Sequence, residues 1–155
     1  SQDASECDKY VAYDYVENIW TTGRIDRTAG VDRGVFRLPF LAKSDGVVYE
    51  HEVGFEYDGI TPFAETGPIA IGTGEQQISV TSVIPDEKTQ GQVDLKFKSR
   101  LYPNATETEH GPFSPANPTS VRFQGRQIRM RVEGAQGADW RVGIMRLDAR
   151  PGSKR

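Results

Sequence analysis

Carboxylates are concentrated in one short segment of the chain, where Glu50, Glu52, Glu56 and Asp58 occupy even positions and mostly apolar or aromatic residues occupy odd ones. This alternation predicts a β-strand with an acidic face and a core face. Such carboxylates could bind Ca²⁺, which takes several oxygens at about 2.5 Å, or act as paired glycosidase acids roughly 5–9 Å apart. Alternate residues of a strand lie about 7 Å apart, too far for all four to bind one ion. We therefore expect no metal site. A hydrolase using this strand is the least favoured hypothesis, because such acids normally lie in a cleft.

The two histidines of the chain form no catalytic or metal-binding motif. His51 falls on the core face of the acidic strand, away from its flanking glutamates, so we expect it to be structural. His110 lies in a proline-rich segment and is expected to be solvated. Cys7 is the only cysteine, which excludes an internal disulfide and a thiolate metal cluster. We predict no catalytic residue, no metal and no cofactor.

Arginines dominate the last part of the chain. Ile128, Met130 and Val132 alternate with Arg129 and Arg131, which predicts a strand with an arginine-bearing outer face. Such a face could follow the phosphates of DNA, but without stacked aromatics beside it the contact would be non-specific. The candidates for an interface or a channel lining are Arg122, Arg126, Arg129, Arg131, Glu50, Glu52 and Glu56.

The net charge of −3 conceals an uneven distribution. Residues 1–91 carry sixteen acidic and seven basic side chains, a net charge of −9, whereas residues 92–155 carry six acidic and twelve basic ones, a net charge of +6. The two halves could attract one another between copies of the chain. The simpler interpretation, which we prefer for the acidic strand, is pairing within one sandwich with arginines such as Arg122, Arg129 or Arg131.

The pattern of the whole chain is that of an all-β protein. Its 155 residues are 36% hydrophobic and 10% aromatic, which suits a thin core between solvated sheets. No window shows a sustained helical period. Strands are expected at residues 9–16, 19–25, 34–42, 47–57, 77–84, 92–100, 120–133 and 140–149. We predict an antiparallel, Greek-key-like β-sandwich over residues 31–155, joined or closed by strands in residues 1–30 that could come from a propeller-like part.

Several residues are expected to hold this fold together. Trp20 and Trp140 are predicted core anchors, each burying up to about 200 Å². Arg27, Arg126 and Arg146 are candidates for forked ion pairs that lock strands or subunits.

Two long segments, residues 58–74 and 101–119, are rich in turn-forming residues and are predicted to be irregular docking loops. No apolar run approaches about 20 residues, so we expect no membrane span.

Three groups of residues resemble the tail-tube terminus, or nozzle, proteins of short-tailed bacteriophages, which are loosely related to packaged-DNA stabilisation proteins. The groups are Tyr13-Asp14-Tyr15 with Trp20-Thr21-Thr22-Gly23 and Arg27-Thr28-Ala29; Val48-Tyr49-Glu50-His51-Glu52 with Gly54, Asp58-Gly59 and Pro85-Asp86; and Gly125-Arg126-Gln127-Ile128-Arg129-Met130-Arg131 with Trp140-Arg141-Val142-Gly143, Arg146-Leu147-Asp148 and Arg150-Pro151-Gly152. Together they span nearly the whole chain. In such proteins a longer, often propeller-like part precedes this region, so the chain would be a fragment or a stand-alone relative.

The resemblance implies a structural, non-enzymatic component of the virion, located in the phage tail and assembled in the host cytoplasm. Its partners would be copies of itself in a ring, adjacent tail or connector proteins, and DNA that passes a channel without sequence recognition. Two complementary patches on each subunit, as the charge split offers, are what a ring requires.

A carbohydrate-binding β-sandwich module, on a phage tail or on a secreted protein, is the alternative function. Trp20, Trp140, Tyr57 and Tyr102 could stack on sugar rings. Exposure separates the two hypotheses: a glycan platform needs coplanar aromatics at the surface, whereas the structural hypothesis buries both tryptophans.

Overall fold

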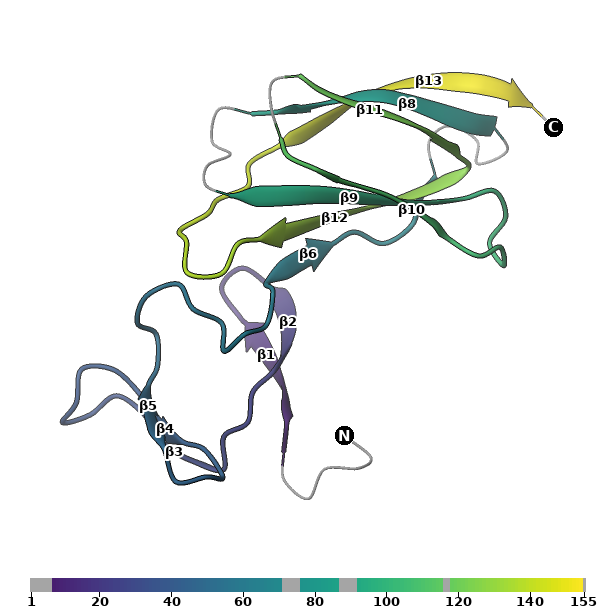
Figure 1. The fold of residues 1–155 in the computed structure, drawn as a ribbon. Helices are drawn as coiled ribbons and strands as arrows, with labels where there is room; N and C mark the ends of the chain where they lie inside the picture. Colours follow the sequence, from purple (N-terminus) through teal and green to yellow (C-terminus); the bar gives the residue numbers. More distant parts are fainter. Residues whose placement is uncertain (1–6, 71–75, 87–91, 116–117, 155) are drawn as a thin grey trace. The chain divides into compact units, whose positions relative to one another are not determined.

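A computed structural model of the protein describes residues 7–70, 76–86, 92–115 and 118–154. These residues form thirteen β-strands and no helix, so the predicted all-β class is confirmed (Figure 1). None of them belongs to a helix that could cross a lipid bilayer. Contacts divide the chain into two compact units, Ser1–Ile60 and Thr61–Arg155.

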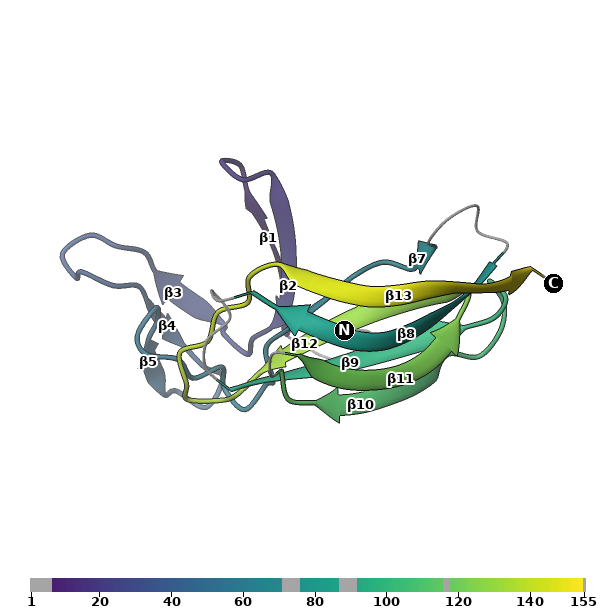
Figure 2. The same cartoon turned by 90° about the horizontal axis from the view of Figure 1, so that it is seen from above.

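The second unit is the predicted antiparallel β-sandwich. One sheet has the order β10-β9-β12-β6, with β7 also paired to β12, and the other has the order β11-β8-β13. Figure 2 shows β11, β8 and β13 lying over the other sheet. The strands are β6 (Phe63–Glu65), β7 (Ile69–Ala70), β8 (Gln76–Pro85), β9 (Val93–Arg100), β10 (Thr108–Phe113), β11 (Thr119–Gly125), β12 (Gln127–Gly134) and β13 (Met145–Lys154).

Alternation in the sequence builds the core of this sandwich. In β9, Val93, Leu95 and Phe97 are at most 4% exposed, whereas the intervening residues face outward. Phe97 packs on Phe123 of the facing sheet, with ring centroids 5.0 Å apart. Each large apolar side chain buried here contributes roughly 1.5–3 kcal/mol. The buried apolar residues are Ile78, Val80, Val83, Val93, Leu95, Phe97, Val121, Phe123, Ile128 and Val132.

The chain passes from one sheet to the other at Arg126. The sequence predicts a single strand over residues 120–133, but β11 ends and β12 begins on either side of this residue, in different sheets. A Cβ on Gly125 would lie 2.8 Å from the Cβ of Ser99. The close approach of the two strands therefore requires glycine at the crossing point.

Regular structure also occurs in both segments that were predicted to be loops. β10 lies within residues 101–119 and pairs with β9, while β6 and β7 lie within residues 58–74 and pair with β12. The register of β10 shifts between His110 and Phe113, at a Gly-Pro pair. β10 was missed because Gly and Pro, usually turn signals, here form a bulge in an edge strand. β6 and β7 have only three and two residues, too few for an alternating pattern to show.

The first unit consists of two small sheets. β1 (Lys9–Asp14) and β2 (Ile19–Arg24) form an antiparallel hairpin, and their bounds are close to those predicted from the sequence, residues 9–16 and 19–25. β3 (Ala29–Val31), β4 (Phe40–Ala42) and β5 (Val48–Glu50) form a separate sheet. Taking each residue as a whole, backbone included, none of the described residues 7–60 is buried.

The division of the chain falls after Ile60, further along than the expected boundary between residues 30 and 31. Between residue 31 and Ile60 the described strands are β4 and β5, of three residues each, and they pair in the order β3-β4-β5.

The predicted strand at 47–57 is wrong beyond Glu50. Glu52, Gly54 and Asp58 have φ angles of 62°, 68° and 53°, in the left-handed region, which turns the chain out of the extended conformation. The acidic face and the aromatic face inferred from the alternation are therefore absent from this part of the described structure. The predicted strand at 34–42 is also shortened, to β4 alone.

Candidate interaction surfaces

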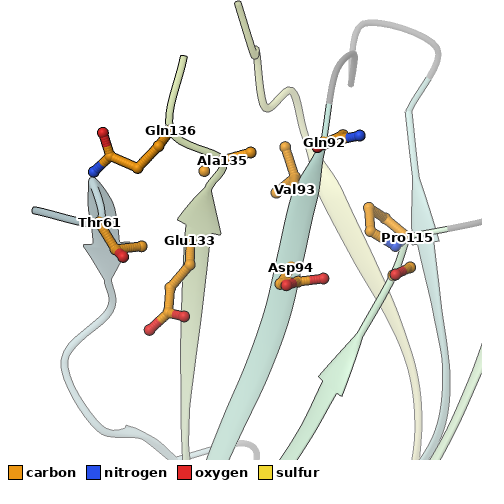
Figure 3. Close-up of a pocket in the computed structure, with 10 residues that line it drawn as sticks. Thr61, Gln92, Val93, Asp94, Pro115, Glu133, Ala135 and Gln136 are labelled. Carbon is orange, nitrogen blue, oxygen red and sulfur yellow. The ribbon is translucent and has the colours of Figure 1, made fainter. Parts of the chain in front are cut away.

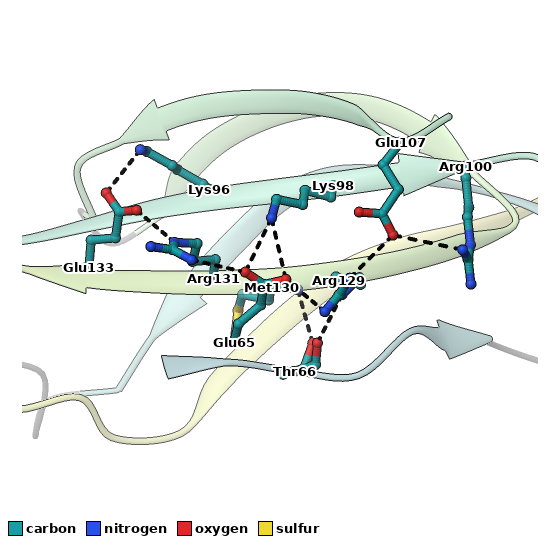
Figure 4. Close-up of polar contacts among 10 residues, drawn as sticks. All are labelled: Glu65, Thr66, Lys96, Lys98, Arg100, Glu107, Arg129, Met130, Arg131 and Glu133. Atoms are coloured by element: carbon teal, nitrogen blue, oxygen red, sulfur yellow. Dashed lines mark hydrogen bonds and ion pairs between the residues drawn. The ribbon is translucent and has the colours of Figure 1, made fainter. Parts of the chain in front are cut away.

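The outer face of the sheet β10-β9-β12-β6 carries a layer of paired charges, which we call the charged layer (Figure 4). Its residues alternate with the buried residues of β9 and β12 and are joined by glutamates from neighbouring segments. The charged layer consists of Glu65, Lys96, Lys98, Arg100, Glu107, Arg129, Arg131 and Glu133.

Glu65 lies at the centre of the charged layer. Its carboxylate accepts contacts from Arg129 Nη2 at 2.8 Å, Arg131 Nη1 at 3.2 Å and Lys98 Nζ at 3.2 Å, and its side chain is only 11% exposed. Burial alone would raise the pKa of Glu65. Hydrogen bonds from Arg131 and Lys98, with the charges of Lys98 and Arg129, outweigh burial and hold that pKa below its usual range. This residue is ionised and fully engaged at neutral pH.

A second glutamate closes one end of the charged layer. Glu133 accepts from Lys96 Nζ at 2.9 Å and from Arg131 Nε at 2.6 Å. The hydrogen bond from Lys96 is the main reason that the pKa of Glu133 lies below its usual range. The guanidinium of Arg131 also lies over the ring of Phe63, 3.7 Å from its centroid.

These contacts correct the expected partners of the arginine face. Arg129 and Arg131 pair with Glu65, Glu133 and Glu107 of their own unit. The sequence could not reveal Glu65, because its short strand lies in a segment predicted to be a loop. Since both arginines are already paired, their capacity to attract DNA phosphates is reduced.

The polar centre of the first unit is Arg27, whose side chain is 6% exposed. Its guanidinium donates to His51 Nε2 at 2.9 Å and to Asp58 Oδ2 at 3.3 Å, and lies 4.2 Å from the centroid of Tyr49. Burial and then the charge of Arg27 lower the pKa of His51, against the opposing charges of Asp58 and Glu52. His51 is thus a neutral acceptor that orients Arg27, a structural task.

The other interface candidates are dispersed. Glu50 and Glu56 are exposed, and Glu52 forms an ion pair with Arg33. Arg122 on β11 is also exposed.

Arg126 is half-buried at the crossing between sheets, where its backbone N–H donates to the carbonyl of Arg100 at 2.9 Å. Arg146 is exposed on β13.

The two tryptophans differ in environment. Trp140 packs against the sandwich core, and its indole Nε1 is buried without a hydrogen-bond partner among the described residues. The expectation that Trp20 is a core anchor is wrong, because 68% of this residue is exposed. Trp20 instead stacks on Tyr13 across the β1–β2 hairpin, with ring centroids 4.5 Å apart and an interplanar angle of 28°.

A hollow of about 620 Å³ opens at one end of the sandwich (Figure 3). Asp94 of β9 and Glu133 of β12 lie on its wall beside amide and hydroxyl side chains. A general acid needs a raised pKa, whereas Glu133 has a lowered one. The described residues contain no group of three or more His, Cys, Asp or Glu side chains placed to hold a metal ion.

His110 is not solvated as expected. It is half-buried, stacks on Phe123 with ring centroids 4.8 Å apart, and its Nε2 lies 2.9 Å from Ser99 Oγ. His110 is the register partner of the buried Phe97 on β9, so its side chain lies on the same, inner face of the sheet. Ser99 is only 5% exposed, which leaves its hydroxyl little access to a substrate.

No protein-family model matches the sequence, and comparison with curated proteins found no significantly similar one.

Proposed function

We propose that the chain is a non-enzymatic structural component of a bacteriophage tail, one subunit of a ring at the nozzle or the head-to-tail channel. The observation that carries the assembly part of this proposal is the contrast between the two units. Among the described residues, sixteen of the twenty-one exposed large hydrophobic residues belong to residues 1–60, whereas all ten buried ones belong to residues 61–155. A folded segment without a core of its own depends on another surface to cover its apolar side chains.

Charge supports association between copies. The first unit has twelve acidic and six basic side chains, a net charge of −6, and the second has ten acidic and thirteen basic ones, a net charge of +3. Opposite charges on two parts of one subunit favour head-to-tail contacts, which form a ring when the rotation between successive copies closes. The tail location, with adjacent tail or connector proteins as further partners, rests on the sequence resemblance.

Contact with DNA in a channel would fall to the exposed arginines of the sheet β11-β8-β13. Arg122, Arg146 and Arg150 lie on its two edge strands and are exposed. Among the described residues these arginines carry no ion pair to a carboxylate, unlike those of the charged layer. Such contacts would be non-specific and would weaken as salt increases.

The test is the mass of the purified chain by analytical ultracentrifugation at several concentrations, at low and physiological salt, followed by electron microscopy of the largest species. We expect a single closed oligomer with ring-shaped particles. A chain that stays monomeric at high concentration and low salt contradicts the proposal.

Carbohydrate binding is the second candidate, favoured by the exposed stack of Trp20 on Tyr13. An aromatic surface of this kind is what a sugar ring packs against. Binding on an oligosaccharide array that is lost in Trp20→Ala, with a monomeric mass in both proteins, would favour this function over assembly.

A further inference from the structure

The β1–β2 hairpin has two open strand edges. Within the described structure each strand pairs only with the other. Their register runs unbroken from the Lys9–Arg24 pair to the Asp14–Ile19 pair, without a bulge. Neither strand contains proline. Backbone N–H and C=O groups along such edges are ready to pair with a further strand.

The edges of the sandwich are protected in the ways that normally prevent this pairing. The register of β10 breaks between His110 and Phe113, and that of β11 between Ser120 and Phe123. β13 contains two register shifts and Pro151. The remaining edge strands β3, β5, β6 and β7 have at most three residues each. Among the described strands, the hairpin alone therefore offers long, unprotected edges.

The hairpin also exposes enough apolar surface for a stable contact. Seven large side chains of the hairpin and its turn are between 45% and 83% exposed: Tyr10, Val11, Tyr13, Tyr15, Val16, Ile19 and Trp20. With aromatic side chains of roughly 150–250 Å², these exposures amount to on the order of 800 Å² over the two faces and the turn, and the part next to each paired edge is what strand pairing would cover. A two-stranded hairpin left alone in water is marginally stable at best.

We infer that this hairpin joins copies of the chain, with β2 of one copy pairing antiparallel to β1 of the next. The inference rests on the proposed self-assembly and names the surface that performs it. The occupant is a second copy because, in the described chain, only another hairpin presents an unprotected edge of the same length. Pairing β2 with β1 uses both edges of every hairpin, so a closed ring has no open edge, whereas pairing two β1 strands leaves both β2 edges open. In the same register as within the hairpin, Trp20 lies beside Tyr13 of the next copy and extends the aromatic stack.

A spin label on Cys7 tests this arrangement in the native sequence. Cys7 is exposed, is the only cysteine, and lies two residues before β1 begins. In the inferred ring, labels on adjacent copies lie at the same end of the sheet, two strand spacings or about 10 Å apart, which broadens the electron paramagnetic resonance spectrum. Two β1 strands paired around a two-fold axis would place the labels at opposite ends, more than about 20 Å apart.

Two hairpin variants and one matched control complete the test. Trp20→Ala removes the aromatic stack, and Thr22→Lys places a charge on the β2 edge while keeping that stack. Both should raise the dissociation constant of the oligomer by at least about tenfold. Tyr102→Ala, at an exposed aromatic residue of the sandwich, should leave the constant unchanged.

The outcomes separate the inference from the proposed function. An oligomer that shows no spectral broadening, or that is unaffected by both hairpin variants, overturns the hairpin inference and leaves self-assembly standing. A native chain that never associates overturns both.

Discussion

Removing the charge of Glu65 should destabilise the sandwich, because this one carboxylate faces three cations. Glu65→Gln keeps the size and an acceptor oxygen but leaves Lys98, Arg129 and Arg131 without their common partner. An exposed ion pair contributes about 0.2–1 kcal/mol, and loss of one partner from a buried pair costs about 3–5 kcal/mol. The side chain of Glu65 is 11% exposed and those of its partners 23–33%. Between these limits we expect a loss of about 2 kcal/mol in the free energy of unfolding.

Urea denaturation followed by tryptophan fluorescence measures this loss, with Glu109→Gln as the control. Glu109 is an exposed residue of the same sheet, on β10, so its substitution should change the free energy of unfolding by less than about 0.5 kcal/mol. Equal effects of the two substitutions would refute the role assigned to Glu65.

The dependence on pH provides a second check. The pKa of Glu65 lies below its ordinary value of 4.5 in the folded protein. The contribution of Glu65 to the free energy of unfolding is therefore fully present above pH 4.5, and it is lost as the pH falls through the lower pKa that Glu65 has in the folded protein. The difference between the native protein and Glu65→Gln should shrink at acidic pH. A difference that grows on acidification would contradict the account.

Three further predictions concern single residues. In an NMR titration, the pKa of His51 should lie below its ordinary value of 6.5, and the substitution Arg27→Met should move that pKa upward. The contribution of His51 to the free energy of unfolding is therefore present above pH 6.5 and falls as the pH drops. Trp140→Phe should change the free energy of unfolding by less than about 1 kcal/mol, because it removes a buried donor without a described partner. Trp140→Ala also removes the packing against the core and should cost about 3 kcal/mol. Equal losses of the two variants in urea unfolding would contradict this prediction. Gly125→Ala should cost about 1–3 kcal/mol of thermal stability by crowding the facing strand, while Gly67→Ala, which meets open space, should be nearly neutral.

The sequence predicts the sandwich well where one side of a strand is buried. β8 and β9 were predicted to within a residue or two, because their buried residues alternate with outward-facing ones. The arginine-bearing face of β12 was also predicted from alternation, and Ile128 and Val132 are buried opposite it.

Alternation failed in the first unit, where none of the described residues is buried as a whole residue. The acidic segment at residues 50–58 has a regular pattern, but positive φ angles at Glu52 and Asp58 end the strand, and local sequence did not indicate them. The sequence predicted the arginines of the charged layer but not their central glutamate. These arginines stand out by spacing, whereas Glu65 comes close to them only through long-range strand pairing. Trp20 shows the same limit, since its residue type suggests burial and only the structure shows that no core surrounds it.

The accessibility of Trp20 as a function of concentration tests most directly whether copies of the chain cover the first unit. The chain has two tryptophans, so Trp20 is the only one left in the Trp140→Phe variant. Acrylamide quenching of its fluorescence would be measured alongside the mass of the protein. We predict strong quenching in the dilute monomer and a several-fold weaker one as the oligomer forms. Quenching that stays the same while the mass increases, or protection already in the monomer, would contradict the claim that assembly covers this surface.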